Sequence, residues 1–211
     1  SSDLAANYLT RPPKRSDVLS VFAGLRPLAA PRSEGKKTKE ISRSHKLIRE
    51  KSGLITIIGG KWTTYRKMAQ DTLDLAIRYM HIPTKDCITE RYQIHGSRKN
   101  PDFSDPLYVY GTDADEIRNL VASSPAMAEK LHPDYAYTVG EVTWLVRNEM
   151  PRTLEDVLAR RLRILFLDAR AAMAMAPKVA GILATEWGKD ETWTSAQVKA
   201  FNEVASNYIL N

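Results

Sequence analysis

A chain of 211 residues is long enough for one or two compact domains, and its 43% apolar content is ordinary for a globular protein, which argues against disorder. The single cysteine, Cys87, excludes an intramolecular disulfide and, from this chain alone, a cysteine-ligated iron–sulfur cluster or zinc ribbon. The net charge of +6 fits an anionic small substrate or an anionic membrane surface. Nucleic acid is disfavoured as a partner, because neither zinc-finger spacing nor an aromatic–basic pattern is present.

The sequence contains neither a membrane-spanning segment nor a recognisable secretory signal. Its longest apolar runs, 54–58 and 164–167, are far too short to cross a bilayer. The first residues lack the basic, apolar and small-residue pattern of a secretory signal. One cysteine fits a reducing compartment. These features predict a cytoplasmic protein.

The first half of the chain mixes strand and helix signals. Residues 17–23 combine β-branched and aromatic side chains in near alternation, which predicts a strand. Residues 40–49 alternate well enough for a strand or hairpin arm, and 51–53 supply a turn. The β-branched apolar run 54–58 is typical of a strand buried on both faces. Apolar residues at helical spacing then predict a helix over 62–80.

The second half of the chain is helical throughout. Residues 96–106 are rich in turn-forming residues and are the predicted linker. Four hydroxyl-led segments match capping boxes or their acidic analogues: 112–115, 138–141, 153–156 and 194–197. They predict helices near 113–122, 139–149, 154–166, 168–187 and 195–208, with a kink or break at Pro177. The expected fold class is α+β: a sheet remnant with a helix over 1–95, and an all-α domain over 107–211.

The most informative local pattern is the glycine pair Gly59-Gly60, which separates the apolar run from the helix. Glycines let a ligand approach the backbone closely, and the start of a helix presents free N–H groups and a positive dipole end. Lys61 would add a positive charge, and the hydroxyls of Thr63 and Thr64 could donate hydrogen bonds. The competing interpretation is a purely structural turn, since a Gly-Gly turn before a helix is common.

Arg26 follows the strand predicted over 17–23 and is held between Gly24 and Pro27. Ligands often bind at such strand ends in α/β sheets, and a guanidinium can clamp a phosphate or carboxylate through two hydrogen bonds. The alternative is an incidental surface ion pair.

Three further polar residues are weaker candidates. Arg43 has no distinctive context by itself. His45 and His81 could act as acid–base groups, as histidine side chains do in general, but the sequence shows no partner for either, so a solvated or structural role is favoured.

Two groups of motifs resemble one known family. The segments FAGLRPL (22–28), ISRSHKL (41–47) and LITIIGGKWTTYRKMAQDTLD (54–74) closely resemble the end of the FAD domain in FAD-dependent glycerol-3-phosphate dehydrogenases and oxidases. TLEDVLARRLR (153–163) resembles the signature of that family's helical C-terminal domain. GGKxTTYR together with TLEDVLARR is specific, and the resemblance covers nearly the whole chain.

The resemblance implies a role for each candidate residue. Arg26 and Arg43 would bind the phosphate of glycerol 3-phosphate. Lys61 would act in catalysis, by stabilising the negative charge of the reduced flavin. The loop against the flavin ring of FAD would consist of Gly59, Gly60, Lys61, Trp62, Thr63 and Thr64. In the family, the flavin takes a hydride from C2 of the substrate, yields dihydroxyacetone phosphate and passes electrons to quinone or oxygen.

One departure from the family pattern limits this expectation. No G-x-G-x-x-G follows a strand and no Walker loop is present, so the chain lacks the usual cradle for a dinucleotide pyrophosphate. We therefore expect an isolated fragment that binds FAD weakly or not at all and is inactive alone. Peripheral contact with the inner face of the cytoplasmic membrane and a homodimer stay open. The alternatives are an independent helical interaction or membrane-surface module, or part of a flavin-dependent amine or amino-acid oxidase.

Overall fold

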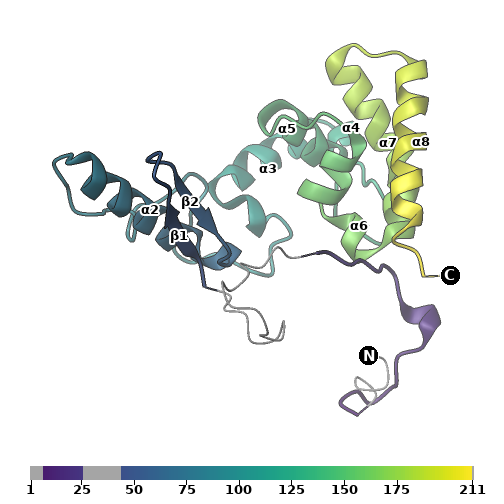
Figure 1. Cartoon of the computed structure of the whole chain (residues 1–211). Helices are drawn as coiled ribbons and strands as arrows, with labels where there is room; N and C mark the ends of the chain where they lie inside the picture. Colours follow the sequence, from purple (N-terminus) through teal and green to yellow (C-terminus); the bar gives the residue numbers. More distant parts are fainter. Residues whose placement is uncertain (1–6, 26–43, 211) are drawn as a thin grey trace. The chain divides into compact units, whose positions relative to one another are not determined.

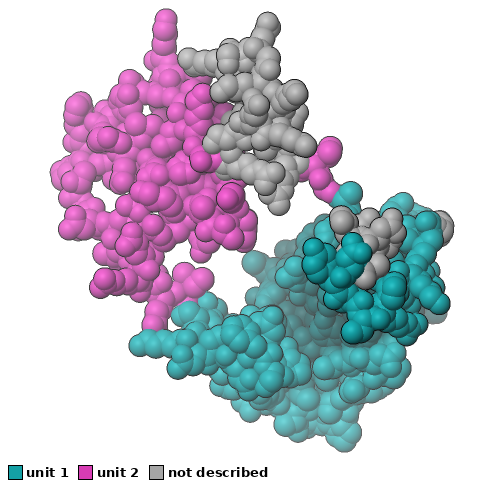
Figure 2. Space-filling model, turned by 90° about the horizontal axis from the view of Figure 1, so that it is seen from below, with its two compact units in different colours: residues 1–23, 95–211 teal, residues 24–94 magenta. Residues whose placement is uncertain are grey.

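A computed structural model describes residues 7–25 and 44–210 of the chain. They form two compact units, one of residues 24–94 and one that joins residues 1–23 to 95–211 (Figure 2). The chain is mostly helical with one small antiparallel sheet, which confirms the predicted α+β class. The sequence-based limits 1–95, 96–106 and 107–211 stay a prediction.

The unit of residues 24–94 contains a hairpin followed by a helix. Strands β1 (Lys46–Arg49) and β2 (Ile55–Ile58) pair antiparallel, with Lys46 opposite Ile58. A 3-10 turn, η3 (Trp62–Thr64), leads into helix α2 (Tyr65–Met80) (Figure 1). The predicted hairpin is confirmed over 46–58, while 40–43 of its first arm lie outside the described residues, and the helix predicted over 62–80 is confirmed with a 3-10 turn as its start.

This unit has no buried residue among the described positions 44–94. The prediction that strand 54–58 is buried on both faces is wrong for this structure: β2 is half-buried along its length, and Leu54 is 62% exposed. Among the described residues of this unit, one strand and one helix pack against β2. A two-stranded sheet of this size cannot build a core by itself.

The second unit is a helical bundle with its own core. Its elements are η1 (Arg15–Asp17), η4 (Tyr108–Asp113), α3 (Ala114–Ala122), α4 (Pro125–Ala128), α5 (Val139–Asn148), η5 (Asp156–Arg161), α6 (Ile164–Leu167), α7 (Ala169–Trp187) and α8 (Glu191–Ser206). Helix α7 packs against α8, α5 and α6 (Figure 1). Fully buried Leu145, Leu158, Leu165, Met175 and Leu183 fill the space between the helices.

Several helix starts agree with the capping chemistry of the sequence. The Thr138 side chain accepts a hydrogen bond from the Glu141 amide at the start of α5. Thr153 and Asp156 cap each other, since the Asp156 amide donates to Thr153 Oγ1 (3.2 Å) and the Thr153 amide donates to the Asp156 carboxylate (3.0 Å). The cap at Thr194 is wrong: α8 begins one turn earlier, where Asp190 accepts from the Trp193 amide.

Two helical predictions need correction. The helix expected over 154–166 is divided into η5, which is a π-helix, and α6, because Arg163 takes a left-handed conformation (φ 61°) between them. Helix α7 runs through Pro177 without a break. Pro177 lies on the exposed side of the helix, while Met175 and Ala176 before it and Val179 and Ala180 after it are buried in the core.

The strand expected over 17–23 is also wrong. Residues 18–23 pair with no strand among the described residues, and they belong to the helical unit. The Val21 amide donates to the Tyr208 carbonyl (2.8 Å), and the Ala169 amide donates to the Leu19 carbonyl (3.2 Å). The Phe22 ring packs edge-on against Phe166. Alternating apolar residues therefore serve an extended segment here, not a sheet.

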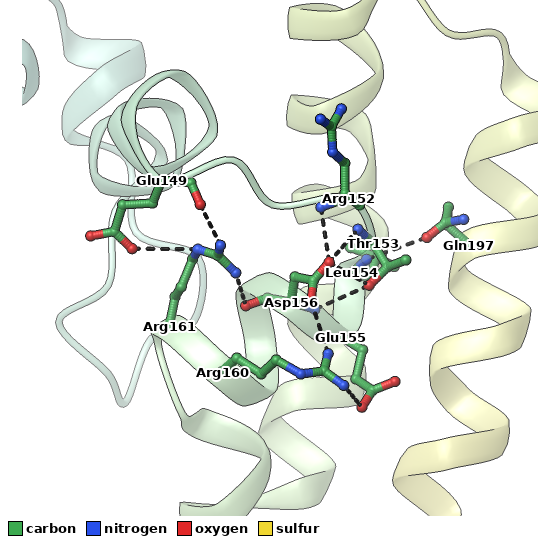
Figure 3. A network of polar contacts seen from close by, with 9 residues as sticks. All are labelled: Glu149, Arg152, Thr153, Leu154, Glu155, Asp156, Arg160, Arg161 and Gln197. Atoms are coloured by element: carbon green, nitrogen blue, oxygen red, sulfur yellow. Dashed lines mark hydrogen bonds and ion pairs between the residues drawn. The ribbon is translucent and has the colours of Figure 1, made fainter. Parts of the chain in front are cut away.

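A polar network surrounds the TLEDVLARR motif (Figure 3). Arg161 donates to the Asp156 and Glu149 carbonyls and pairs with the Glu149 carboxylate at 3.4 Å. Arg160 pairs with both Glu155 and Asp156. These contacts tie the end of α5 to η5, so the motif stabilises the turn between two helices.

We expect Asp156→Ala to lower the free energy of unfolding by about 1–3 kcal/mol, because two backbone amides and Arg160 lose their acceptor. Urea unfolding followed by tryptophan fluorescence measures this loss. The matched control, Glu155→Ala, removes only an exposed ion pair and should cost less than about 0.5 kcal/mol. Equal losses in the two variants would contradict the capping role.

A buried carboxyl, Glu141, lies inside the helical unit at 4% exposure. Tyr110 donates a hydrogen bond to it at 2.6 Å. Burial raises the pKa of Glu141 above its ordinary value, although the Tyr110 hydroxyl and the Thr138 amide oppose that shift. Ionisation of Glu141 therefore destabilises the folded chain.

The sign of this effect predicts a pH dependence. When the pKa of a carboxyl is higher in the folded than in the unfolded state, the group does not lower the free energy of unfolding at a pH below its unfolded pKa. The free energy of unfolding then falls as pH rises from the unfolded pKa toward the folded pKa. The melting temperature of Glu141→Gln, relative to the native chain, should accordingly increase from pH 4 to pH 8. Thermal melts at a series of pH values test this, with a substitution at an exposed position, Glu203→Gln, as the control. A difference in melting temperature between Glu141→Gln and the native chain that stays constant with pH would refute the prediction.

Candidate functional site

The turn between β2 and the helix start requires both of its glycines. Gly59 and Gly60 have φ angles of 74° and 84°, a region that side chains with a Cβ rarely adopt. A Cβ on Gly60 would lie 2.5 Å from Met68 Sδ and 3.2 Å from His45 Cβ. The backbone of the turn therefore lies close to the Met68 side chain of α2, and the two glycines carry no side chain themselves.

The next residues form a self-contained cap. The Lys61 amide donates to Thr64 Oγ1 (3.2 Å), and both the Thr64 amide and the Thr64 hydroxyl donate to the Lys61 carbonyl (2.9 Å each). In contrast, the amides of Gly60, Trp62 and Thr63 bond to no acceptor in the described part of the chain. These N–H groups lie at the positive end of a 16-residue helix, where they can receive a ligand acceptor.

Two side chains extend the turn toward solvent. Trp62 is 88% exposed, and its ring lies 6.0 Å from that of Tyr65. Lys61 is exposed and pairs with no carboxylate within residues 7–25 and 44–210. An ammonium, free amides and an uncovered aromatic surface thus occur within five residues. This combination suits a flat ring that carries negative charge at one edge.

A polar cluster beside the turn was not predicted from the sequence. His45 Nε2 lies 2.9 Å from Asp71, whose other oxygen pairs with Lys67 at 2.8 Å. The hydrogen bond from Lys67, together with the one from His45, lowers the pKa of Asp71. The sequence could not show this pair, because His45 and Asp71 are 26 residues apart and the fold of the hairpin onto α2 brings them together.

The structure brings together the six residues 59–64, but it does not test their roles. The two predicted phosphate ligands, Arg26 and Arg43, lie outside the described residues. Among the described residues, no group of three or more histidine, cysteine, aspartate or glutamate side chains is arranged to hold a metal ion. Within the same residues, every helix is too short or too polar to span a bilayer.

Comparison with known proteins places these elements in one family. A family model described as the C-terminal domain of alpha-glycerophosphate oxidase matches residues 54–194. This range includes both the Gly59-Gly60 turn and the TLEDVLARR network.

Individual relatives agree with the family model. The chain is 32% identical, over 97% of its length, to the mitochondrial glycerol-3-phosphate dehydrogenase SDP6 of Arabidopsis thaliana, of which it covers 40%. It is 36% identical, over 93% of its length, to a Caenorhabditis elegans protein named as a probable mitochondrial glycerol-3-phosphate dehydrogenase. It is 30% identical to the Mus musculus mitochondrial enzyme, and it covers 29% of each of these two. The chain thus spans well under half the length of these relatives, and it belongs to the family of FAD-dependent glycerol-3-phosphate dehydrogenases and alpha-glycerophosphate oxidases, within their C-terminal region.

Proposed function

We propose that this chain supplies the flavin-side loop and the helical C-terminal domain of an FAD-dependent glycerol-3-phosphate dehydrogenase. The complete enzyme would convert sn-glycerol 3-phosphate into dihydroxyacetone phosphate and pass the electrons to quinone or another acceptor. The observation that supports this most directly is the turn at Gly59-Gly60, which leaves three backbone amides and the Lys61 ammonium without a partner among the described residues.

The turn fits the chemistry of a flavin ring. FAD, when bound, supplies the hydride acceptor of the reaction. A glycine at position 59 places no Cβ between the backbone and a planar ring, whereas the corresponding space at Gly60 is filled by Met68 and His45. Amides at the positive end of α2, together with Lys61, would stabilise the negative charge that reduction places on the N1–C2=O edge of the ring. Lys61 would thereby favour the transition state over the oxidised ground state.

The substrate side of the proposal depends on two arginines. Arg26 and Arg43 would hold the dianionic phosphate through charge-assisted hydrogen bonds. Arginine suits this role because its planar guanidinium presents paired donors to phosphate oxygens. The chain alone carries no G-x-G-x-x-G, so we also propose that it neither retains FAD tightly nor turns over substrate by itself. A titration with FAD, followed by flavin fluorescence, tests that part.

In the complete enzyme, we expect Arg26→Ala to raise the KM for glycerol 3-phosphate about ten- to hundredfold, because a phosphate charge loses a charged partner. Steady-state kinetics measure the change. The matched control is Arg91→Ala, which removes an exposed arginine of the same unit and should leave KM unchanged. Unaltered kinetics in Arg26→Ala would remove this residue from the site.

Lys61→Met tests the flavin side separately. We expect kcat to fall roughly tenfold or more and the flavin reduction potential to become more negative, because the reduced ring loses a nearby positive charge. A spectroelectrochemical titration measures the potential, and the exposed Lys85→Met serves as the control. An unchanged potential in Lys61→Met would contradict the proposed position of the ammonium.

A further inference from the structure

A groove of about 370 Å³ in the helical unit is lined by Arg152, Trp187, Lys189 and Trp193. We propose that this groove binds a small organic anion, with a carboxylate or phosphate group on a flat apolar body. The proposal is independent of the flavin-side loop, since all four lining residues lie in the other compact unit.

The TLEDVLARR network fixes the backbone of Arg152 and leaves its guanidinium free to bind an anion. Of the three arginines that Figure 3 draws, Arg160 and Arg161 are occupied by carboxylates and backbone carbonyls. Only the backbone amide of Arg152 takes part, through a 2.9 Å hydrogen bond to Asp156. Its guanidinium points away from the network and pairs with no carboxylate in the part of the chain that the structure describes (Figure 3).

The backbone at Arg152 is fixed on both sides. The preceding Pro151 is buried, and Met150 before it is in a left-handed conformation (φ 47°). A non-glycine residue keeps such a conformation only where its surroundings determine it. The fixed turn lowers the entropy that Arg152 would lose on binding a ligand.

Lys189 gives the groove a second positive charge. It follows Gly188, the left-handed cap of α7, and its amide donates to the Ala184 carbonyl at 2.9 Å. None of the described residues that line the groove carries a carboxylate. The adjacent Asp190 is already used, because it accepts from the Trp193 amide at 2.8 Å. The charged lining therefore consists of donors alone, which favours an anion over a neutral or cationic ligand.

The two indoles indicate that the ligand has a flat apolar body beside its anionic group. Trp187 and Trp193 are half-buried and meet edge to face, with ring centroids 5.8 Å apart. Neither indole N–H donates to an acceptor in the described chain, whereas the indole of Trp144 is bonded to Glu116 at 2.9 Å. The groove thus offers aromatic surface beside its cations, and no described acceptor occupies the N–H group of either indole. Its volume lies at the small-molecule end of protein pockets.

The indole N–H signals of the isotopically labelled full chain provide a direct test by NMR. Each tryptophan signal is assigned from the corresponding Trp→Phe variant. The probes are phenyl phosphate and phenylacetate, with inorganic phosphate as the charge without the ring and phenylacetamide as the ring without the charge. We expect both aromatic anions to shift the Trp187 and Trp193 signals at submillimolar to millimolar concentration, and to leave the Trp144 signal in place.

Arg152→Gln should weaken binding of phenyl phosphate about tenfold, because a charge-assisted contact is lost. The matched control, Arg170→Gln, removes an exposed arginine at the start of α7 that does not line the groove, and it should bind as the native chain does. Equal affinity in the two variants, equal binding of phenylacetamide, or no shift at millimolar probe would overturn the proposal. So would a response to phosphatidylglycerol vesicles without any response to the soluble anions.

Discussion

The helical unit depends on close packing along one long helix. The buried face of α7 consists mainly of alanines, with Met175, Val179 and Leu183 between them. Small side chains allow α5, α6 and α8 to approach the α7 backbone, and alanine loses no side-chain entropy when it is buried. This burial also explains why Pro177 does not end the helix. A proline inside a helix costs about 3 kcal/mol, and the buried residues on both sides of Pro177 offset that cost.

The hairpin unit is held by a different kind of constraint. It buries none of its described residues, so its conformation follows from local backbone geometry: one tight turn, a glycine pair and a capped helix. Its apolar groups, including Leu54, Trp62 and Leu73, stay largely uncovered within the unit. Both features support the proposed function. An enzyme needs a turn of defined shape against its cofactor, and a strand with two apolar faces needs additional protein to cover it.

The sequence predicted correctly the elements that are determined by neighbouring residues. Its predictions were wrong where contacts with residues far along the chain determine the structure. The hairpin, the helix after Gly59-Gly60 and the cap at Thr138 follow from neighbouring residues. The segment at 18–23 has the sequence pattern of a strand, but the backbone of Val21 bonds to Tyr208, far along the chain. The start of α8 was ambiguous, since Asp190 and Thr194 both have side chains able to cap. The structure places the six residues 59–64 in one turn, but their roles and those of Arg26 and Arg43 stay predictions. The Trp187 groove has no sequence motif, because three chain segments assemble it.

The TLEDVLARR motif, which lies within the range that the family model matches, concerns folding more than chemistry. Thr153 and Asp156 cap each other, and Arg161 closes the end of α5, so most of the motif's polar groups are bonded within the chain. Groups that are saturated in this way cannot bind substrate without breaking structure. Donors that the fold leaves unpaired can contact a ligand without this cost. Within the described chain, the Gly59–Thr64 turn meets that condition in one unit and Arg152 meets it in the other. The same criterion, unpaired donors on a backbone that is otherwise fixed, thus supports both the proposed flavin contact and the proposed anion site.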